Sequence, residues 1–227
     1  MRRPVPEELI SLMTSDLLTS GGRQPSFTRL FAAVANMLLL DTYIRPSALL
    51  ELTRRNVARP SPELGGVYGK HYAIVLAPQE SGRTTKSGEQ DDSLLVGDCG
   101  RGWLAQVMQI LVAATSNDQT PLLPISLNQY EGALRASSAR LGLAPGLVTP
   151  HVIRHTGASS DRLKKRRGLK AIKKRGTWKA DKSVARYEKQ GLILFTAREL
   201  SSATKTAAKQ AHSAVPALLL QHLRRQL

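Results

Sequence analysis

Cysteine and aromatic residues are scarce in this chain. Cys99 is the only cysteine among 227 residues, so neither an intramolecular disulfide nor a cysteine-based metal site can form, which fits a reducing compartment. Aromatic residues make up 4% of the sequence against 41% hydrophobic residues in all, so the core must consist mainly of Leu, Ala, Val and Ile. This composition favours helices over an all-β sandwich.

Long apolar runs are also missing. The longest uninterrupted ones are far shorter than the roughly 20 residues that span a bilayer. The apolar positions near the N-terminus are interrupted by Glu7, Glu8 and Asp16, unlike the core of a signal peptide. We therefore expect no membrane partner and an intracellular location: the nucleus if the source is eukaryotic, otherwise the cytoplasm.

Acidic residues are outnumbered: 17 Asp and Glu stand against 33 Lys and Arg, which gives a net charge of +16. Such an excess implies an anionic partner, and nucleic acid is the first candidate, ahead of a membrane surface. Few aromatic residues are present for base stacking, which disfavours an RNA-binding protein. The sequence also lacks a Walker-type glycine loop and a carboxylate cluster of the kind that holds catalytic magnesium. We expect no cofactor, no metal and no small-molecule substrate.

Helical patterns dominate the chain. Pro6 and the two acids after it predict a first helix that ends before Gly21. Residues 26–40 are apolar on nearly all sides, as expected of a buried central helix. Pro46 fits the first turn of another helix, with Arg45 at its start. Further helical patterns cover 103–116, 126–142, 151–163, a short segment of the basic stretch that follows, 183–189 and 197–227, the last broken or bent at Pro216.

One part of the chain has strand character. Residues 71–77 and 92–98 are rich in β-branched and aromatic residues, and the polar, turn-rich residues 79–90 connect them. The simplest interpretation is a β-hairpin whose connection carries Lys86. The predicted fold class is therefore mainly α with a small antiparallel β-hairpin or sheet (α+β).

The segment from His151 to Tyr187 carries the chemistry. On a helix, His151, Arg154 and His155 share one face. The two histidines could bind zinc, but the sequence lacks a third ligand near them, and a solvated basic helix end is the more serious alternative. The hydroxyl of Tyr187 has an ordinary pKa near 10, so as a nucleophile it needs a base and a field that stabilises charge at the reacting phosphate.

Trp178 lies nine residues before Tyr187 within GTWKADKSVARYEK, and a first arginine and a lysine lie upstream in IRPSALLEL and TTKSGE. In chain order the set is Arg45, Lys86, His151, Arg154, Trp178 and Tyr187. This ordered set resembles the catalytic domain of tyrosine recombinases, also called phage integrases, over about residues 5–195. The stretch around Trp178 is most similar to Trp-bearing recombinases of eukaryotic mobile elements.

The resemblance implies a tyrosine-recombinase catalytic-domain fold and DNA strand cleavage and rejoining through a 3′-phosphotyrosine intermediate, in site-specific recombination or integration of a mobile element. Arg45 and Arg154 would clamp the phosphate oxygens, because guanidinium groups offer paired donors that stay charged. His151 would accept the phenolic proton or hold a phosphate oxygen, and Lys86 would protonate the departing 5′ oxygen. Trp178 would stabilise the pocket. The partner would be double-stranded DNA, bound by a homo-oligomer, a tetramer on DNA.

The resemblance also divides the chain. Residues 1–195 would form the catalytic domain and 196–227 a C-terminal helical tail, docked on a neighbouring protomer or on its own domain. We expect the N-terminal core-binding domain of the family to be absent.

A basic stretch links two active-site elements. Contact with DNA phosphates is expected there, and a nuclear localisation signal is an alternative. The residues proposed for DNA contact are Arg162, Lys164, Lys165, Arg166, Arg167, Lys173, Lys174, Arg175 and Lys179.

One departure from the family pattern keeps other functions open. Ala48 stands where the family usually has an acid, three residues after the first arginine, and Glu51 is the nearest substitute. A degenerate, non-catalytic DNA-binding module and a type IB topoisomerase-like enzyme that relaxes DNA therefore remain alternatives.

Overall fold

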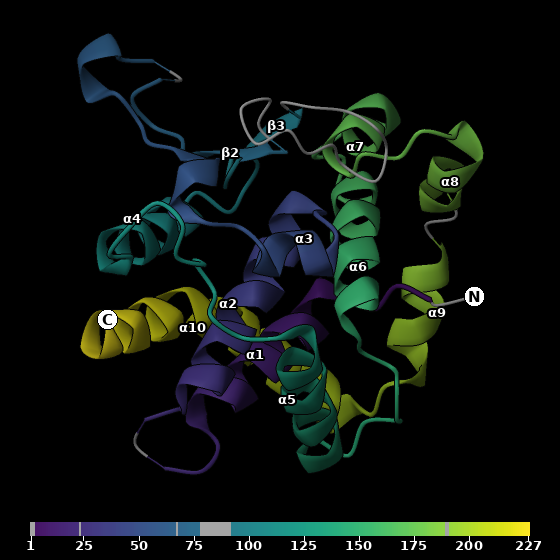
Figure 1. Ribbon diagram of the computed structural model, residues 1–227. Helices are drawn as coiled ribbons and strands as arrows, with labels where there is room; N and C mark the ends of the chain where they lie inside the picture. The colour runs from purple at the N-terminus through teal and green to yellow at the C-terminus, as the bar shows by residue number, and fades with distance from the viewer. Residues whose placement is uncertain (1–2, 23, 67, 78–91, 189–190) are drawn as a thin grey trace.

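The computed structural model describes residues 3–227 except 23, 67, 78–91 and 189–190. Helices form most of the fold, and a small sheet covers one end of the helical body (Figure 1). The helices are α1 (Glu7–Thr19), α2 (Phe27–Thr42), α3 (Pro46–Leu50), α4 (Leu104–Ala114), α5 (Leu127–Arg140), α6 (Pro150–Leu163), α7 (Leu169–Arg175), α8 (Asp181–Ala185), α9 (Gly191–Glu199) and α10 (Ser202–Gln226). Short 3₁₀ turns are η1 (Arg54–Asn56), η2 (Pro62–Leu64) and η4 (Arg186–Glu188).

Helix α2 is the central helix, as its nearly uniform apolar sequence predicts. Every residue from Leu30 to Thr42 is buried, and α1, α5, α6 and α10 all pack against it. The polar Asn36 at its middle is satisfied, because it donates to the Thr14 hydroxyl and accepts from the Tyr130 hydroxyl. Burial of a polar group at the centre therefore carries no uncompensated cost.

The sheet has the order β1 (Val57–Ala58), β2 (Ala73–Leu76), β3 (Asp92–Leu95), with antiparallel neighbours. Ile74 pairs with Leu94, and both side chains are buried against the helices. The predicted hairpin is confirmed in β2 and β3, whereas β1 was not expected, because a strand of two residues is too short to show an alternating pattern. Lys86 lies outside the described residues.

Helix α6 packs closely against α2. It begins with Pro150, and the Thr149 hydroxyl accepts a hydrogen bond from the backbone N–H of Val152. A side chain at Gly157 would overlap the Leu40 carbonyl oxygen and the Tyr43 ring. The glycine therefore sets the distance between the two helices that carry the candidate active site.

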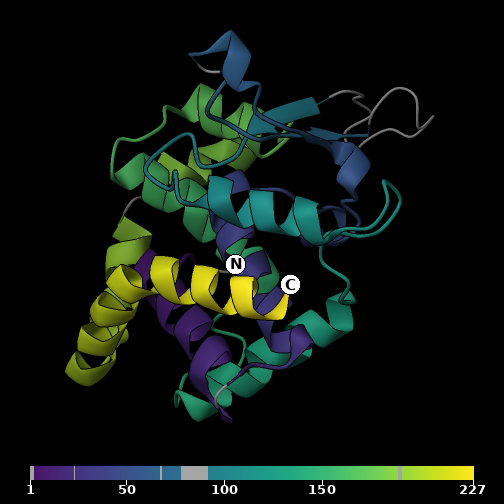
Figure 2. The ribbon, with the colours of Figure 1, turned by 90° about the vertical axis from the view of Figure 1, so that its left-hand side faces the viewer.

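The C-terminal helix packs on its own domain. Val215, Leu219 and Leu223 of α10 are buried in the main core, and α10 lies along α1 (Figure 2). Helix α10 continues through Pro216, so the helix is not broken there. Among the described residues, no helix combines the length and the apolar character needed to cross a membrane.

We predict that Gly157→Ala lowers the free energy of unfolding by about 1–3 kcal/mol, because the added methyl group forces α6 away from α2. Gly132→Ala in α5 is the matched control, since its new methyl group would meet only the end of the Arg135 side chain. This control should be neutral or stabilising by up to about 1 kcal/mol. Urea denaturation measures both, and equal stability of the two variants would contradict the close approach.

Candidate active site

Arg45 lies at the turn between α2 and α3. Helix α2 ends at Tyr43, whose backbone is left-handed (φ 56°), and Arg45 is the residue before Pro46 at the first position of α3. The fixed ring of Pro46 starts the new helix. Arg45 is partly exposed, and its charge acts on Arg154.

Arg154 is held by two carbonyl oxygens from distant segments. Its Nε donates to the carbonyl of Tyr43 (2.6 Å) and its Nη2 to the carbonyl of Gly176 (2.6 Å). The side chain is buried, and burial lowers the pKa of Arg154 to about 10, with the nearby charge of Arg45 acting in the same direction. The guanidinium is therefore charged at neutral pH and fixed in position, which suits an anion ligand.

Tyr187 is buried in the same region. It lies in η4, is 1% exposed, and its hydroxyl oxygen is 2.7 Å from Nδ1 of His155. Burial raises the pKa of Tyr187 above its ordinary value, although Arg154 and Arg186 act in the opposite direction. The phenol is neutral at physiological pH.

The Trp178 ring lies next to Tyr187, His155 and Arg154. Its ring lies 5.1 Å from that of Tyr187 and 6.2 Å from that of His155, and the Arg154 guanidinium carbon is 4.7 Å from its centre. A side chain at Gly176 would overlap the Trp178 ring, so glycine is required where the chain turns beside it. Trp178 therefore packs among the rings of Tyr187 and His155 and the Arg154 guanidinium.

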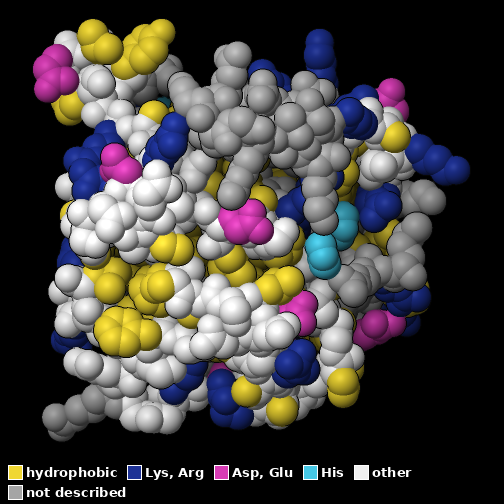
Figure 3. All heavy atoms as spheres, viewed as in Figure 1, with side chains coloured by type: hydrophobic (Ala, Val, Ile, Leu, Met, Phe, Trp, Pro, Cys, Tyr) yellow, Lys and Arg dark blue, Asp and Glu magenta, His cyan; other side chains and the backbone are white. Residues whose placement is uncertain are grey.

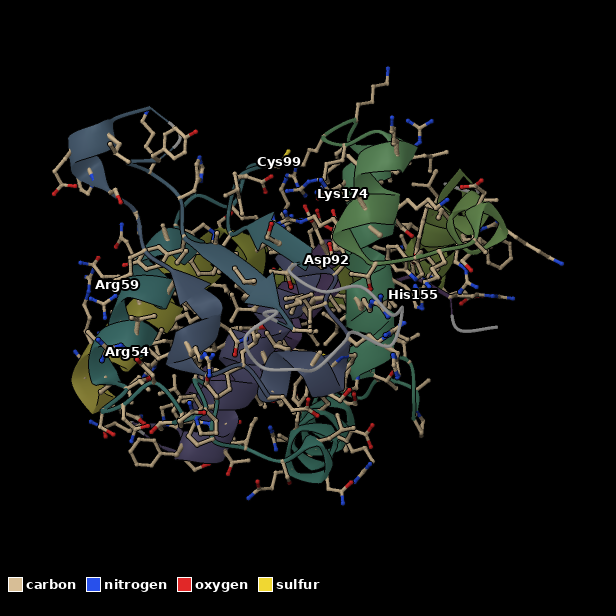
Figure 4. The ribbon with its side chains drawn as sticks, turned by 45° about the horizontal axis from the view of Figure 1, so that its top comes forward. Arg54, Arg59, Asp92, Cys99, His155 and Lys174 are labelled. Atoms are coloured by element: carbon tan, nitrogen blue, oxygen red, sulfur yellow. The ribbon has the colours of Figure 1, made fainter. Side chains whose placement is uncertain are left out.

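The structure thus brings together Arg154, Trp178 and Tyr187, with Arg45 at the edge of the cluster. His151 lies on the first turn of α6 and is exposed. His155 was the residue left out of the predicted catalytic set, although its position four residues after His151 and directly after Arg154 was visible in the sequence. Figure 4 shows His155 on α6, on the side that faces α8, and Figure 3 shows histidines at the surface there, among Lys and Arg side chains.

A buried ion network lies behind the site. Asp161 of α6 is fully buried and accepts hydrogen bonds from Tyr43, Arg101 and Arg167. The Arg101 guanidinium also bonds Glu7 at 2.8 Å and lies 3.6 Å from an oxygen of Asp41. Helices α1, α2 and α6 are therefore tied together through Arg101.

Two of the residues proposed for DNA contact belong to this network instead. Arg167 pairs with Asp98 and Asp161, and Arg175 pairs with Asp41 and Asp98. Both arginines are buried, at 9% and 8% exposure. Their inward direction corrects the expectation of DNA contact, because the buried carboxylates of Asp161 and Asp41 bind them.

The other basic residues of this stretch reach the surface to different extents. Lys164, Lys165, Lys174 and Lys179 are exposed, and Arg162, Arg166 and Lys173 are partly exposed. Lys164 pairs with Glu7 and Glu8, and Lys173 pairs with Asp181. Lys174 projects from α7 at the end of the molecule that carries the sheet (Figure 4). Lys165, Lys174 and Lys179 thus offer the most accessible positive charge.

A metal site would have one candidate in the described part of the chain. Glu7, Glu8 and His212 place possible ligand atoms within 4.8 Å of one another. The Glu7 carboxylate is, however, already bonded to Lys164 and Arg101. These two side chains already pair with the carboxylate that a metal ion would need. Glu7 therefore belongs to the ion network.

The comparisons with known proteins concern the fold. No protein-family model and no curated protein matches the sequence. The XerH site-specific recombinase bound to difH substrate matches in its pre-cleavage complex with a TM-score of 0.57 and 12% identity, over 88% of this chain and 53% of the XerH chain. The post-cleavage complex of XerH with palindromic difH substrate gives 0.54 and 12%, over 89% and 52%. The XerA recombinase gives 0.49 and 18%, over 93% and 65%.

The likeness to XerH shows that this chain has a tyrosine recombinase fold. The predicted class, mainly helical with a small antiparallel sheet, is confirmed. The chain spans about half the length of the XerH chain.

The ion network predicts an acid-sensitive fold. Burial alone would raise the pKa of Glu7, but Arg101 and Lys164 outweigh it and lower the pKa from 4.5 to about 2. The stabilisation is therefore complete above pH 4.5 and is lost as the pH falls towards 2, a change of about 3 kcal/mol.

Glu7→Gln should remove this share, so that the free energy of unfolding falls less steeply between pH 5 and pH 2. Glu8→Gln, at a partly exposed neighbour, should leave the slope as it is. Urea denaturation at a series of pH values measures both, and equal slopes for Glu7→Gln and the unchanged chain would contradict the prediction.

Proposed function

We propose that this chain cleaves and rejoins DNA strands through a 3′-phosphotyrosine bond to Tyr187, in site-specific recombination or integration of a mobile element. The observation that carries the proposal is the cluster of Tyr187, His155, Arg154 and Trp178, drawn from three separate segments around one phenolic oxygen. The imidazole on the Tyr187 hydroxyl and the nearby charge of Arg154 are the partners that a nucleophilic tyrosine requires.

The reaction would transfer a phosphoryl group from the 5′ oxygen to the Tyr187 oxygen. The Tyr187 oxygen attacks the phosphorus atom, the bond to the 5′ oxygen breaks, and the strand keeps a free 5′ hydroxyl. Charge grows on the non-bridging oxygens, where Arg154 and Arg45 would donate. Lys86, in the role that the family resemblance gives it, would protonate the departing 5′ oxygen. A 5′ hydroxyl from another strand then reverses the steps, so the bond energy is conserved.

Double-stranded DNA is the proposed partner. The net charge of +16 supports it, and XerH, whose fold this chain shares, is described as bound to a difH substrate. We also propose that strand exchange requires a homo-oligomer on DNA, a tetramer, because two duplexes must each be cut on both strands.

A non-catalytic DNA-binding module is the second candidate, favoured by Ala48. Ala48 packs against the main core, and Glu51 at the end of α3 is exposed. The position of the usual acid is thus filled by an apolar contact. Type IB topoisomerase-like relaxation would use the same covalent bond but no paired sites, so a plasmid relaxation assay beside a two-site strand-exchange assay separates it from recombination.

The covalent bond itself is testable. We expect the unchanged chain, mixed with a pool of nicked duplexes of randomised sequence, to give a protein–DNA adduct that survives SDS. Tyr187→Phe should give none, because it lacks the attacking oxygen. Tyr68→Phe, at an exposed tyrosine, should react as the unchanged chain does. Peptide mass mapping must place the adduct on Tyr187, and failure of all three proteins would support the binding module.

The surface lysines should set the salt dependence of binding. Lys165→Gln combined with Lys174→Gln should reduce the slope of log K against log salt by about 2, near 0.9 for each lost phosphate contact. The pair Lys205→Gln and Lys209→Gln, on exposed positions of α10, removes the same charge and should leave the slope unchanged. Fluorescence anisotropy with a labelled duplex between 50 and 200 mM salt measures it, and equal slopes for the two pairs would contradict this DNA-binding face.

A further inference from the structure

The proton of the Tyr187 hydroxyl must go to a base before or during attack. We propose that His155, rather than His151, is this base, an inference that rests on the function proposed above. The distance of 2.7 Å between the Tyr187 oxygen and Nδ1 of His155 is that of a direct hydrogen bond. As the base, His155 must accept this bond from the phenol at Nδ1, with the ring proton of the neutral imidazole on Nε2.

His151 is placed for a different task. It lies one helical turn before His155, about 6 Å along the axis of α6, and its side chain is exposed. Tyr187 is 1% exposed and meets α6 at His155. His155 is therefore in contact with the proposed nucleophile, whereas His151 lies at the surface one turn away.

Trp178 fixes the direction of the imidazole. The two rings are nearly parallel, with 18° between their planes and 6.2 Å between their centres. The Trp178 ring also lies beneath Arg154. An imidazolium formed on proton uptake would lie against a π face, which favours a cation. The same ring thus aligns the arginine that would hold the phosphate and the histidine that holds the proton.

The Tyr187 oxygen forms a bond to phosphorus while its proton passes to Nδ1 of His155. The bond from phosphorus to the 5′ oxygen breaks, and Lys86, in the role proposed above, gives that oxygen a proton. In the reverse step, the attacking 5′ hydroxyl returns its proton to Lys86, and the His155 imidazolium returns the other proton to the departing Tyr187 oxygen. Because burial raises the pKa of Tyr187, a base is needed all the more at neutral pH.

The test uses a DNA on which the unchanged chain forms its adduct. His155→Asn keeps an acceptor atom near the position of Nδ1 but cannot take a proton. We expect adduct formation to slow by about 10² to 10⁴-fold, the usual contribution of a general base. A second substrate carries sulfur in place of the bridging 5′ oxygen, and its thiolate leaves without an acid, since thiols have a pKa near 8.5. This substrate should restore Lys86→Ala and leave His155→Asn slow.

A loss of less than tenfold in His155→Asn, or its rescue by the sulfur substrate, would overturn the proposal. Thermal unfolding checks that the variant is folded, and ¹⁵N NMR of His155 in the unchanged protein gives a readout that needs no variant. Nδ1 must appear as an unprotonated acceptor, and a proton on Nδ1 would also overturn the proposal. If the unchanged chain forms no adduct at all, the proposed function fails and this inference with it, whereas an active chain with a fast His155→Asn defeats the inference alone.

Discussion

The ion pairs of the buried Arg101 guanidinium are the interactions on which the rest of the structure depends. The guanidinium meets carboxylates from α1, α2 and α6, namely Glu7, Asp41 and Asp161, in a region from which water is excluded. Removing one partner from such a buried network typically costs about 3–5 kcal/mol, because the remaining charges lose their compensation. Since Tyr43 and Arg154 are fixed between the same helices, the geometry of the candidate site is set by these ion pairs.

The ion network decides which basic residues of the chain remain at the surface. Taken by itself, the basic stretch predicts a DNA-contacting surface. Arg167 and Arg175 nevertheless point inward to the carboxylates of Asp161 and Asp41. Burial of those carboxylates is tolerated only because the arginines neutralise them. Lys165 and Lys174 of the same stretch remain exposed. The bidentate geometry of the guanidinium suits Arg167 and Arg175 to the buried carboxylates.

The parts of the fold that depend on local patterns were predictable, and the parts that depend on distant pairing were not. The apolar residues 26–40 indicated a central helix, and Pro46 marked a helix start that the structure confirms. The inward direction of Arg175 depends on Asp41, 134 residues away in the sequence, and no periodicity encodes that contact. The contact between His155 and Tyr187 is of the same kind, since it depends on how η4 returns to α6.

Burial gives Tyr187 two opposed properties. A phenol out of water is harder to ionise, so at rest it is a poor nucleophile. The same enclosure makes each fixed charge and dipole around it more effective than it would be in water. Arg154 is already held by the carbonyls of Tyr43 and Gly176 and does not have to be ordered when a phosphate binds. In the proposed reaction, Tyr187 would gain reactivity when a phosphate binds beside Arg154, which already lies in place next to Trp178.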